Sequence, residues 1–253
     1  MPVRESQARR SEIVRLARSS GLASVEELSA QFGVTASTIR RDLNRLTSEG
    51  LIARTYGGAI ALEPESSFRQ RALEAFDAKR AIARWAAAQV QPGETVLLDA
   101  GTTVGAMGEF LREIADLTVV TAGLTVLDEL ADADAVRVEC IGGTLRHLSQ
   151  GFVGPLAEAT LHRLTFDRAF LGADAVTADL GICEAELEQT RLKEIMIERA
   201  GQLYVLAHAD KLGRKPFHAW APLPSGATLV TDTSATPAQT RPFDTAGLRV
   251  IRA

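Results

Sequence analysis

The chain has 253 residues, of which 46% are hydrophobic and 24% charged, and its formal net charge is −4. This is the composition of ordinary globular domains, and the length fits one small and one medium-sized domain. No apolar run approaches the roughly 20 residues that a membrane-spanning helix needs, and the charged N-terminal segment lacks the apolar stretch of a signal peptide. We therefore expect a soluble, cytoplasmic protein.

The two cysteines give no sign of a metal site. Cys140 and Cys183 are far apart in the sequence and follow no metal-ligand spacing. We expect two free, buried thiols in a reducing compartment, and neither a metal nor a cofactor.

Charge is divided unevenly along the chain. Residues 1–60 hold nine Arg and six Asp or Glu, a net charge of +3, whereas residues 61–253 carry −7. A basic N-terminal part on an acidic body favours contact of the N-terminal part alone with a polyanion such as DNA.

Apolar spacing and capping residues predict the first two helices. Ile13, Leu16 and Ala17 share one face of a first helix. Ser24 and Glu27 have the spacing of a capping box, in which each side chain accepts a hydrogen bond from the other residue's backbone N–H. This box predicts a second helix that runs to about residue 31.

A third helix, capped by Thr35, follows a tight turn at residues 32–34. Its Ile39, Leu43 and Leu46 recur at helical spacing and predict a face that packs on a core. Hydroxyl, Arg and Asn side chains occupy the other faces. Two short helices joined by a tight turn are typical of a helix-turn-helix, whose second helix enters the major groove of DNA.

The candidate DNA-binding residues lie on this helix and on a predicted β-ribbon, or wing, over residues 50–58, which would close on a Gly-Gly turn. Arg suits guanine and Asn suits adenine, while hydroxyls suit phosphate. The expected contacts are Thr35, Ser37, Thr38, Arg40, Arg41, Asn44, Arg45, Arg54 and Tyr56. From spacing alone, the alternative is a solvated basic helix face in a protein that does not bind DNA.

Three segments are expected in all: a winged helix-turn-helix domain over residues 1–60, a linker over 61–75 and an α/β effector-sensing domain over 76–253. Helical spacing returns from residue 68 to about residue 90. This stretch either packs on the sensing domain or transmits its shape to the N-terminal domain, and the sequence favours neither.

Short apolar runs alternate with helical stretches in the third segment, which predicts an α/β fold with a mostly parallel, Rossmann-like sheet. The expected strands are Thr95–Leu98, Leu117–Thr121, Val136–Ile141, Arg168–Leu171, Leu203–Ala207, Thr228–Thr231 and Leu248–Ile251. In such sheets ligands bind beyond the carboxyl ends of the strands.

The residues that follow these strands define a candidate effector site. Glycines let the backbone approach a ligand, and hydroxyls and amides at the start of a helix suit an anion such as phosphate. The expected effector-binding residues are Asp99, Gly101, Thr102, Thr103, Gly142, Gly143, Arg146, Asp174, Lys193, His208 and Lys211. Loops of this kind are also often simple turns and helix caps.

The segment VTASTIRRDLNRLTSEGLIARTYGGA resembles the signature of the DeoR family of regulators, with Thr38-Ile-Arg-Arg-Asp-Leu43 matching its core. The stretches DAGTT, LTVVT, IGGTLR, FVGP and AFLGAD resemble the family's sensor domain. The resemblance implies a fold similar to sugar-phosphate isomerases such as ribose-5-phosphate isomerase, and phosphorylated sugars or related metabolites as inducers. It also implies that Asp99, Gly101, Thr102 and Thr103 hold the ligand and that Lys211 supplies a cation.

Three positions depart from the family pattern. Tyr56 stands where the family more often has His, Ala122 where it usually has Asn, and His208 where it usually has Asp, with Asp210 as a possible substitute. The last two changes predict a less typical effector.

Together these features predict a DNA-binding transcriptional regulator, a repressor of a carbohydrate-metabolism operon that a phosphorylated sugar releases from operator DNA. We expect a homo-oligomer, at least a dimer, because two-fold operators mirror two-fold proteins. The alternative is an enzyme, a sugar-phosphate isomerase-like protein with an appended helical domain, in which Asp174, Glu188 and Lys193 would transfer protons. A nucleic-acid-associated scaffold without a ligand is a third possibility.

Overall fold

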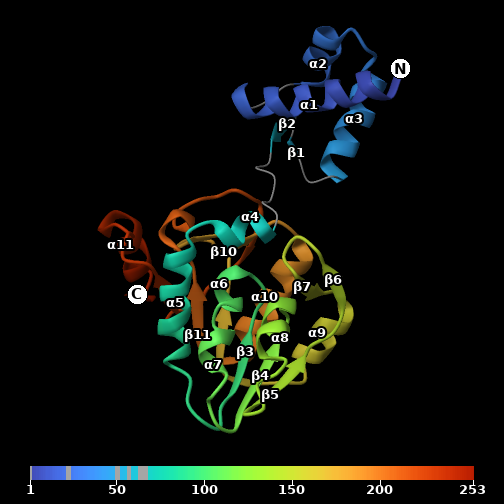
Figure 1. Ribbon diagram of the computed structural model, residues 1–253. Helices are drawn as coiled ribbons and strands as arrows, with labels where there is room; N and C mark the ends of the chain where they lie inside the picture. The colour runs from blue at the N-terminus through green and yellow to red at the C-terminus, as the bar shows by residue number, and fades with distance from the viewer. Residues whose placement is uncertain (1, 21–23, 49–51, 56–57, 62–67) are drawn as a thin grey trace. The chain divides into compact units, whose positions relative to one another are not determined.

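The computed structural model consists of two compact units, Met1–Glu65 and Ser66–Ala253 (Figure 1). It describes residues 2–20, 24–48, 52–55, 58–61 and 68–253, and the side chains of residues 6–16, 24–46, 68 and 70–253. Tyr56, most of the region between the two units and the side chain of Arg54 lie outside the described residues. The expected linker, residues 61–75, includes a short helix that belongs to the second unit.

The N-terminal unit has the helix-turn-helix and ribbon that the sequence predicts. Its elements are α1 (Pro2–Ser20), α2 (Val25–Phe32), α3 (Ala36–Ser48), β1 (Ile52–Thr55) and β2 (Gly58–Ala61). The capping box is present, with the Glu27 N–H donating to Ser24 Oγ at 3.1 Å and the Ser24 N–H to Glu27 Oε2 at 2.8 Å. Gly33 ends α2 at a φ of 61°, a left-handed conformation that glycine adopts without strain. The extent expected for the ribbon, residues 50–58, is wrong: its second strand continues to Ala61, and Gly58 pairs with Thr55 as the first residue of that strand rather than closing the turn.

A small apolar core fixes α3 against the other two helices. Its buried members are Ile13, Val14, Leu28, Ile39, Leu43 and Leu46. Beside this core lies Asp42, a carboxylate only 6% exposed. Arg9 of α1 donates to Asp42 Oδ2 at 2.7 Å, and Arg10 lies 3.5 Å from Oδ1. This ion pair joins the first helix to the third and so orients the exposed face of α3.

The second unit is built on a seven-stranded parallel sheet of order β14-β13-β11-β8-β3-β4-β5. The strands are β3 (Thr95–Leu98), β4 (Leu117–Thr121), β5 (Val136–Cys140), β8 (Phe166–Leu171), β11 (Ala200–Leu206), β13 (Thr228–Thr231) and β14 (Arg249–Arg252). All seven predicted strands are confirmed, with boundaries that differ by up to three residues. Because all seven strands run parallel, their carboxyl ends lie at the same edge of the sheet, and the predicted site is at this edge.

Helices cover both faces of this sheet (Figure 1). The helices are α4 (Phe68–Leu73), α5 (Phe76–Ala87), α6 (Thr102–Gly105), α7 (Gly108–Leu111), α8 (Leu124–Leu130), α9 (Pro155–Leu161), α10 (Leu187–Arg199) and α11 (Pro237–Thr245), with a 3-10 turn η1 at Ala209–Lys211. Val96 and Leu98 of β3 pack with α5–α8, whereas Leu97 packs with α9–α11. Strand residues of alternate parity therefore enter two separate cores, as expected for a sheet buried on both faces.

Five short strands were not predicted. They are β6 (Thr144–Arg146) and β7 (Gly151–Val153), which pair with each other, and β9 (Ala175–Thr177), β10 (Gly181–Glu184) and β12 (Ala219–Ala221), which form a small antiparallel sheet. Cys183 is buried in that sheet, whereas Cys140 is exposed, so the expectation of two buried thiols is wrong for Cys140. Neither forms a disulfide.

The helical stretch from residue 68 is broken between α4 and α5. Ala75 takes a φ of 48°, a left-handed conformation that is costly for a side chain other than glycine. The ammonium group of Lys79 donates to the backbone carbonyl of Arg71 and so closes the end of α4. Among the described residues, no helix is long and apolar enough to span a membrane.

Replacing Asp42 by Ala is expected to lower the unfolding free energy of the N-terminal unit by about 1–3 kcal/mol, because Arg9 and Arg10 lose their counter-charge. Hydrogen exchange at the amides of α1 and α3 measures this loss separately from the second unit, which is called the sensor unit below because it contains the expected effector-sensing domain. The control is Glu26→Ala, an exposed carboxylate on α2, expected to cost about 0.5 kcal/mol or less. Equal protection in the two variants would contradict the structural role given to Asp42.

Candidate functional site

The exposed face of α3 is polar and basic, and it begins with a group of hydroxyls. The Thr38 N–H donates to Thr35 Oγ1 at 3.3 Å, which makes Thr35 the N-cap, and the hydroxyls of Ser37 and Thr38 lie 2.9 Å and 3.0 Å from Thr35 Oγ1. Further along the helix, exposed side chains are contributed by Arg40, Arg41, Asn44 and Arg45. The apolar side of the same helix is fully used by the core, so these groups are the surface that α3 presents.

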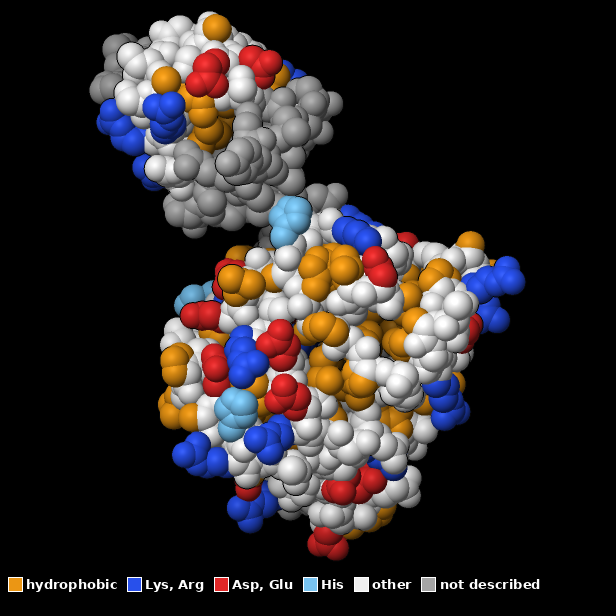
Figure 2. Space-filling model, turned by 180° about the vertical axis from the view of Figure 1, so that it is seen from behind, with side chains coloured by type: hydrophobic (Ala, Val, Ile, Leu, Met, Phe, Trp, Pro, Cys, Tyr) orange, Lys and Arg blue, Asp and Glu red, His pale blue; other side chains and the backbone are white. Residues whose placement is uncertain are grey.

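The sensor unit lacks a comparable basic surface on the face seen in Figure 2. There, acidic and basic side chains are intermixed over the unit rather than gathered by sign. Intermixed charges largely cancel over a Debye length and attract a polyanion weakly. The α3 face is therefore the better candidate for a DNA-binding surface.

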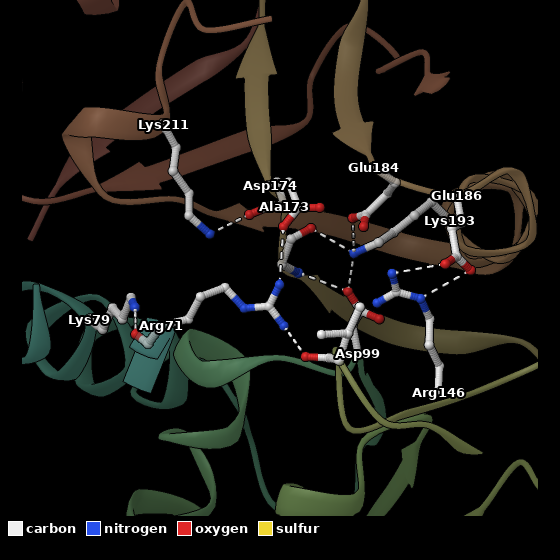
Figure 3. Close-up of polar contacts among 12 residues, drawn as sticks. Arg71, Lys79, Asp99, Arg146, Ala173, Asp174, Glu184, Glu186, Lys193 and Lys211 are labelled. Atoms are coloured by element: carbon white, nitrogen blue, oxygen red, sulfur yellow. Dashed lines mark hydrogen bonds and ion pairs between the residues drawn. The ribbon is translucent and has the colours of Figure 1, made fainter. Parts of the chain in front are cut away.

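In the sensor unit, a buried lysine organises the carboxyl edge of the sheet. The Lys193 ammonium, on α10, forms an ion pair with Asp99 after β3 and lies 3.1 Å from Glu184 Oε1 at the end of β10. It also donates to the Gly172 carbonyl at 2.7 Å, and the Gly172 N–H donates to Asp99 Oδ2 at 3.0 Å. Asp99, Glu184 and Lys193 are each about 95% buried. Figure 3 shows these groups converging from separate elements.

The charges in this cluster stabilise one another. Burial by itself lowers the pKa of Lys193, but Asp99 and Glu184 outweigh burial and raise it overall, so the ammonium keeps its proton. Burial raises the pKa of Glu184, and Lys193 opposes that rise. A lysine held in this way is a structural cation rather than a base that gives up and takes back a proton.

Three further basic side chains, those of Arg71, Lys79 and Lys211, lie near Asp174 and Ala173, which follow β8. Arg71 Nη1 lies 3.6 Å from Asp174 Oδ1, and Arg71 also donates to the Leu148 carbonyl. Lys211 donates to the Ala173 carbonyl, and Lys79 donates to the Arg71 carbonyl (Figure 3). Helices α4 and α5 and the η1 turn thus bring basic side chains to the same edge of the sheet as the Lys193 cluster.

These cations crowd one another. Burial and the charge of Lys211 lower the pKa of Lys79 to about 8. Burial also lowers the pKa of Lys211. The charges of Arg71 and Lys193 lower it further, whereas Asp174 and Glu184 oppose the change. His208, 7% exposed, has its pKa lowered to about 4 by burial and by both lysines, and is neutral at pH 7. An anion placed among these groups would relieve the repulsion, so the cluster has the electrostatics of an anion site.

A cavity of about 370 Å³ lies next to the cations. Lys79 and Thr102 line it together with apolar and charged residues of α4–α8, and the rest of its lining is Phe68, Ala72, Phe76, Arg80, Gly105, Ala106, Glu109, Thr125 and Glu129. Its size is within the usual range for small-molecule sites. A ligand in this cavity would contact both α6 and the two helices that precede the sheet.

The other predicted effector residues are distributed around this edge. Gly101 has a φ of 117° before α6, Thr102 is half-buried and Thr103 is buried. Arg146 lies 3.1 Å from Glu186 on the Lys193 side. Gly142 and Gly143 form the turn between β5 and β6, where a Cβ on Gly143 would meet the Val153 carbonyl at 2.5 Å. Close packing is therefore sufficient to explain Gly143.

Sequence reasoning missed four charged residues at this edge: Arg71, Lys79, Glu184 and Glu186. Glu184 ends β10, a short strand that the apolar pattern did not predict. Arg71 and Lys79 fall in stretches that were treated as linker and as a packing helix. A buried position for Lys79 on the apolar face of α5, three residues before Ile82, was the one available signal.

Two carboxylates proposed from the sequence are exposed rather than buried at this edge of the sheet. Glu188, the candidate proton-transfer group of the enzyme alternative, is exposed on α10. Asp210 is exposed on η1, and the carboxylate that binds this turn is Asp232, which accepts from the Ala209 N–H at 2.7 Å. Within the described ranges, no group of three or more His, Cys, Asp or Glu side chains is placed to hold a metal ion.

Comparison with known proteins finds matches over most of the chain. Residues 9–65 match the DeoR-like helix-turn-helix domain and residues 74–233 the DeoR C terminal sensor domain. The HTH-type transcriptional regulator GlpR of Haloferax volcanii is 34% identical over 96% of both chains, and the transcriptional repressor AccR of Agrobacterium fabrum 30% over 92% of both. The glycerol-3-phosphate regulon repressor of Escherichia coli K12 is 32% identical over 81% of this chain and 82% of its own.

Among solved structures, ribose 5-phosphate isomerase A of Methanocaldococcus jannaschii is similar at a TM-score of 0.40 and 17% identity, over 54% of each chain. At this level no residue is transferred from it.

The fold and its two polar surfaces therefore define a DNA-binding transcriptional regulator with a separate sensor unit. The chain belongs to the DeoR family, on both family models and on relatives aligned over almost its whole length.

Replacing Lys193 by Met is expected to lower the unfolding free energy of the sensor unit by about 3–5 kcal/mol at pH 8, because Asp99 and Glu184 are left buried without a cation. The loss should shrink at pH 5.5. A carboxyl whose folded-state pKa is raised takes up a proton as the pH falls, and this favours the folded state. Urea denaturation of both proteins at the two pH values measures the difference.

The control for this variant is Lys215→Met, which removes an exposed pair with Asp179 and should cost about 0.5 kcal/mol or less at both pH values. A loss for Lys193→Met that is the same at pH 5.5 and pH 8 would contradict the proposed charge balance.

Proposed function

We propose that this chain is a transcriptional repressor that binds operator DNA through α3 and its wing and is released when a phosphorylated sugar, or a related small phosphorylated polyol, binds to the sensor unit. The regulated genes would then serve the metabolism of that compound. The observation that carries the proposal is the crowding of Arg71, Lys79 and Lys211 at the carboxyl edge of the sheet.

We call Arg71, Lys79 and Lys211 the cation cluster. It supports an anionic effector because burying these positive charges together costs free energy when no anion is bound. Burial and the charges of Lys211 and Arg71 lower the pKa of Lys79, and burial, Arg71 and Lys193 lower the pKa of Lys211, in a setting where charge interactions are stronger than in water. The carboxylates that oppose this effect are Asp174, which lies 3.6 Å from Arg71 and acts on Lys211 with Glu184, and Glu74, which acts on Lys79. A phosphate dianion provides two charges and several acceptor oxygens, which Arg and Lys bind well.

A hydroxylated body on the effector is supported by the neighbouring groups. His208 is neutral, and its Nδ1 has no hydrogen-bond partner among the described residues. Thr102 adds a hydroxyl to the wall of the cavity beside Lys79. The name of the Escherichia coli relative, a glycerol-3-phosphate regulon repressor, agrees with this ligand chemistry. Asp99, Gly101, Thr103, Asp174 and Lys193 complete the proposed site.

On the DNA side, Arg40, Arg41, Asn44 and Arg45 are the proposed base and phosphate contacts of α3, with Ser37, Thr38 and the wing residues Arg54 and Tyr56. A single helix-turn-helix offers few contacts, so we propose that at least two copies act together on a two-fold operator. The exposed Leu73 and Phe76, 82% and 61% accessible, are apolar surface that an oligomer would cover.

We propose that the sensor unit binds its ligand without turning it over. The Lys193 ammonium is committed to Asp99, Glu184 and the Gly172 carbonyl, and Glu188 is exposed. Isomerase chemistry needs a base that exchanges a proton with a bound substrate. Isomerisation of sugar phosphates by the purified chain, followed by NMR, would contradict this part of the proposal.

Release from DNA would begin at α4. Arg71 of this helix contacts Asp174 and the Leu148 carbonyl, and its own carbonyl accepts from Lys79. A ligand that draws Arg71 and Lys79 toward its phosphate changes the contacts of the first described helix after the DNA-binding unit. Coupling free energies between two such sites are typically about 1–3 kcal/mol, a change of about 5–150-fold in DNA affinity.

Two variants should separate DNA binding from release. Arg41→Ala is expected to weaken binding to a DNA site selected from a random pool by about 5–150-fold, because one Arg contact is lost, without changing effector binding. Lys79→Ala should bind the same DNA normally but no longer release it when the effector is added. Fluorescence anisotropy of labelled DNA measures both effects.

Lys215→Ala, which changes an exposed lysine of the same unit, is the matched control and should behave as the wild type. Release of Lys79→Ala at wild-type effector concentrations would remove Lys79 from the effector site, and unchanged DNA affinity of Arg41→Ala would remove Arg41 from the DNA interface.

Effector affinity should also depend on pH through Lys79. Its pKa is lowered to about 8, so near pH 7 it is mostly protonated and at pH 9 about one molecule in ten keeps the proton. Because the protonated form binds phosphate, the affinity should fall up to about tenfold from pH 7 to pH 9. Titration calorimetry measures the fall, and Lys79→Arg should abolish it. Equal slopes in the two proteins would exclude Lys79 as the titrating group.

A further inference from the structure

A small cavity lies beside the Asp99–Lys193 pair. Its volume is about 20 Å³, room for about one water molecule. We call it the side cavity; its lining residues include Ala122, Ser149, Gln189 and Leu192, in addition to Asp99 and Lys193. It is distinct from the larger cavity beside Lys79, and the two have no lining residue in common.

Two polar atoms of the side cavity have no hydrogen-bond partner among the described residues. They are Ser149 Oγ and Gln189 Oε1, both buried from solvent, and Ser149 as a whole is only 6% exposed. Buried polar atoms are nearly always paired, and each unpaired one costs free energy. Neither atom therefore contributes a hydrogen bond to the fold, and both are available to a bound molecule that enters the side cavity.

The surroundings limit what that group can be. The cation that lines the side cavity, Lys193, is occupied, since it already contacts Asp99, Glu184 and the Gly172 carbonyl. The side chains of Ala122 and Leu192 form an apolar part of the wall of the side cavity. A charged group would be unpaired there, and anything much larger than a water would not fit. A hydroxyl fits, because it can donate to Gln189 Oε1 and accept from the Ser149 hydroxyl.

We propose that Ser149 and Gln189 are specificity-determining residues that bind one hydroxyl group of the effector, on the part of the molecule remote from its phosphate. The inference rests on the proposed function and narrows the effector class to phosphorylated compounds that carry a hydroxyl at the matching carbon. A deoxy analogue leaves both polar atoms unpaired, and sites of this kind discriminate strongly against such an analogue.

The position of Ser149 also links this contact to the cation cluster. Its neighbour Leu148 gives its carbonyl to Arg71 of α4, so one loop connects the side cavity with the helix that receives the phosphate. Ligands that fill the side cavity thus contact a loop already joined to α4. In Figure 3 Arg71 lies between the Lys79–Lys211 side and the Asp99–Lys193 side, as this arrangement requires.

The test compares sugar phosphates with their deoxy analogues by titration calorimetry. The probes are D-ribose 5-phosphate, D-glucose 6-phosphate and D-fructose 6-phosphate, each with analogues that lack one hydroxyl, and inorganic phosphate as the ligand without a sugar. We expect the wild type to prefer at least one hydroxylated probe over its deoxy analogue by about tenfold or more. Ser149→Ala and Gln189→Leu should each reduce this preference below about threefold and leave the Kd for inorganic phosphate unchanged.

A second measurement separates ligand recognition from a structural role. Because both variants remove an unpaired polar atom, the melting temperature of the unliganded protein should stay the same or rise, whereas loss of a structural contact would lower it. Ser225→Ala and Gln91→Leu, both exposed, are the matched controls and should keep the wild-type preference.

The possible outcomes distinguish this inference from the proposed function. If probes bind but the wild type does not discriminate, or both variants keep the wild-type preference, the side cavity is not a hydroxyl site, while the phosphate-sensing proposal stands. If neither the sugar phosphates nor inorganic phosphate bind, the proposed function fails and this inference fails with it.

Discussion

The sensor unit depends on one buried ion, the ammonium of Lys193. It connects the ends of β3, β8 and β10 to α10 through Asp99, Gly172 and Glu184. A charge in this position is favourable only while all its partners are present, because the free energy of removing it from water must be recovered from them. The constraint keeps the carboxyl edge of the sheet in one geometry, and the cation cluster and the side cavity are built on either side of it.

Much of the fold could be predicted from the sequence, because local rules and tertiary packing agree in those parts. The capping box at Ser24 and Glu27, the apolar face of α3 and the seven strands of the parallel sheet all occur where spacing and composition placed them. The short strands β9, β10 and β12 were not predicted. They lack the runs of Val and Leu that marked strands of similar length such as β3 and β13, and β10 pairs with β12 across a long separation in the sequence.

The candidate site was predicted less completely for the same reason. Asp99, Asp174, Lys193 and Lys211 follow strands or lie on helices near them, so the rule for parallel sheets found them. Glu184 was missed with its strand, and Arg71 and Lys79 were missed because their role arises from three-dimensional crowding. Sequence spacing does not show which cations share one buried region. The structure shows it through the Arg71–Asp174 distance and the lowered pKa of Lys79.

The central claim is that the cluster of Arg71, Lys79 and Lys211 binds a phosphorylated effector. Thermal unfolding with matched phosphorylated and unphosphorylated sugars, on the wild type and on Lys79→Ala, tests it most directly. At about 100 times its Kd a ligand adds roughly 2.7 kcal/mol of stability, a shift of about 5–10 °C for a unit of this size. We expect such a shift for one phosphorylated compound, none for its unphosphorylated partner, and a much smaller shift in Lys79→Ala. Equal shifts with and without the phosphate group, or in both proteins, would contradict this claim.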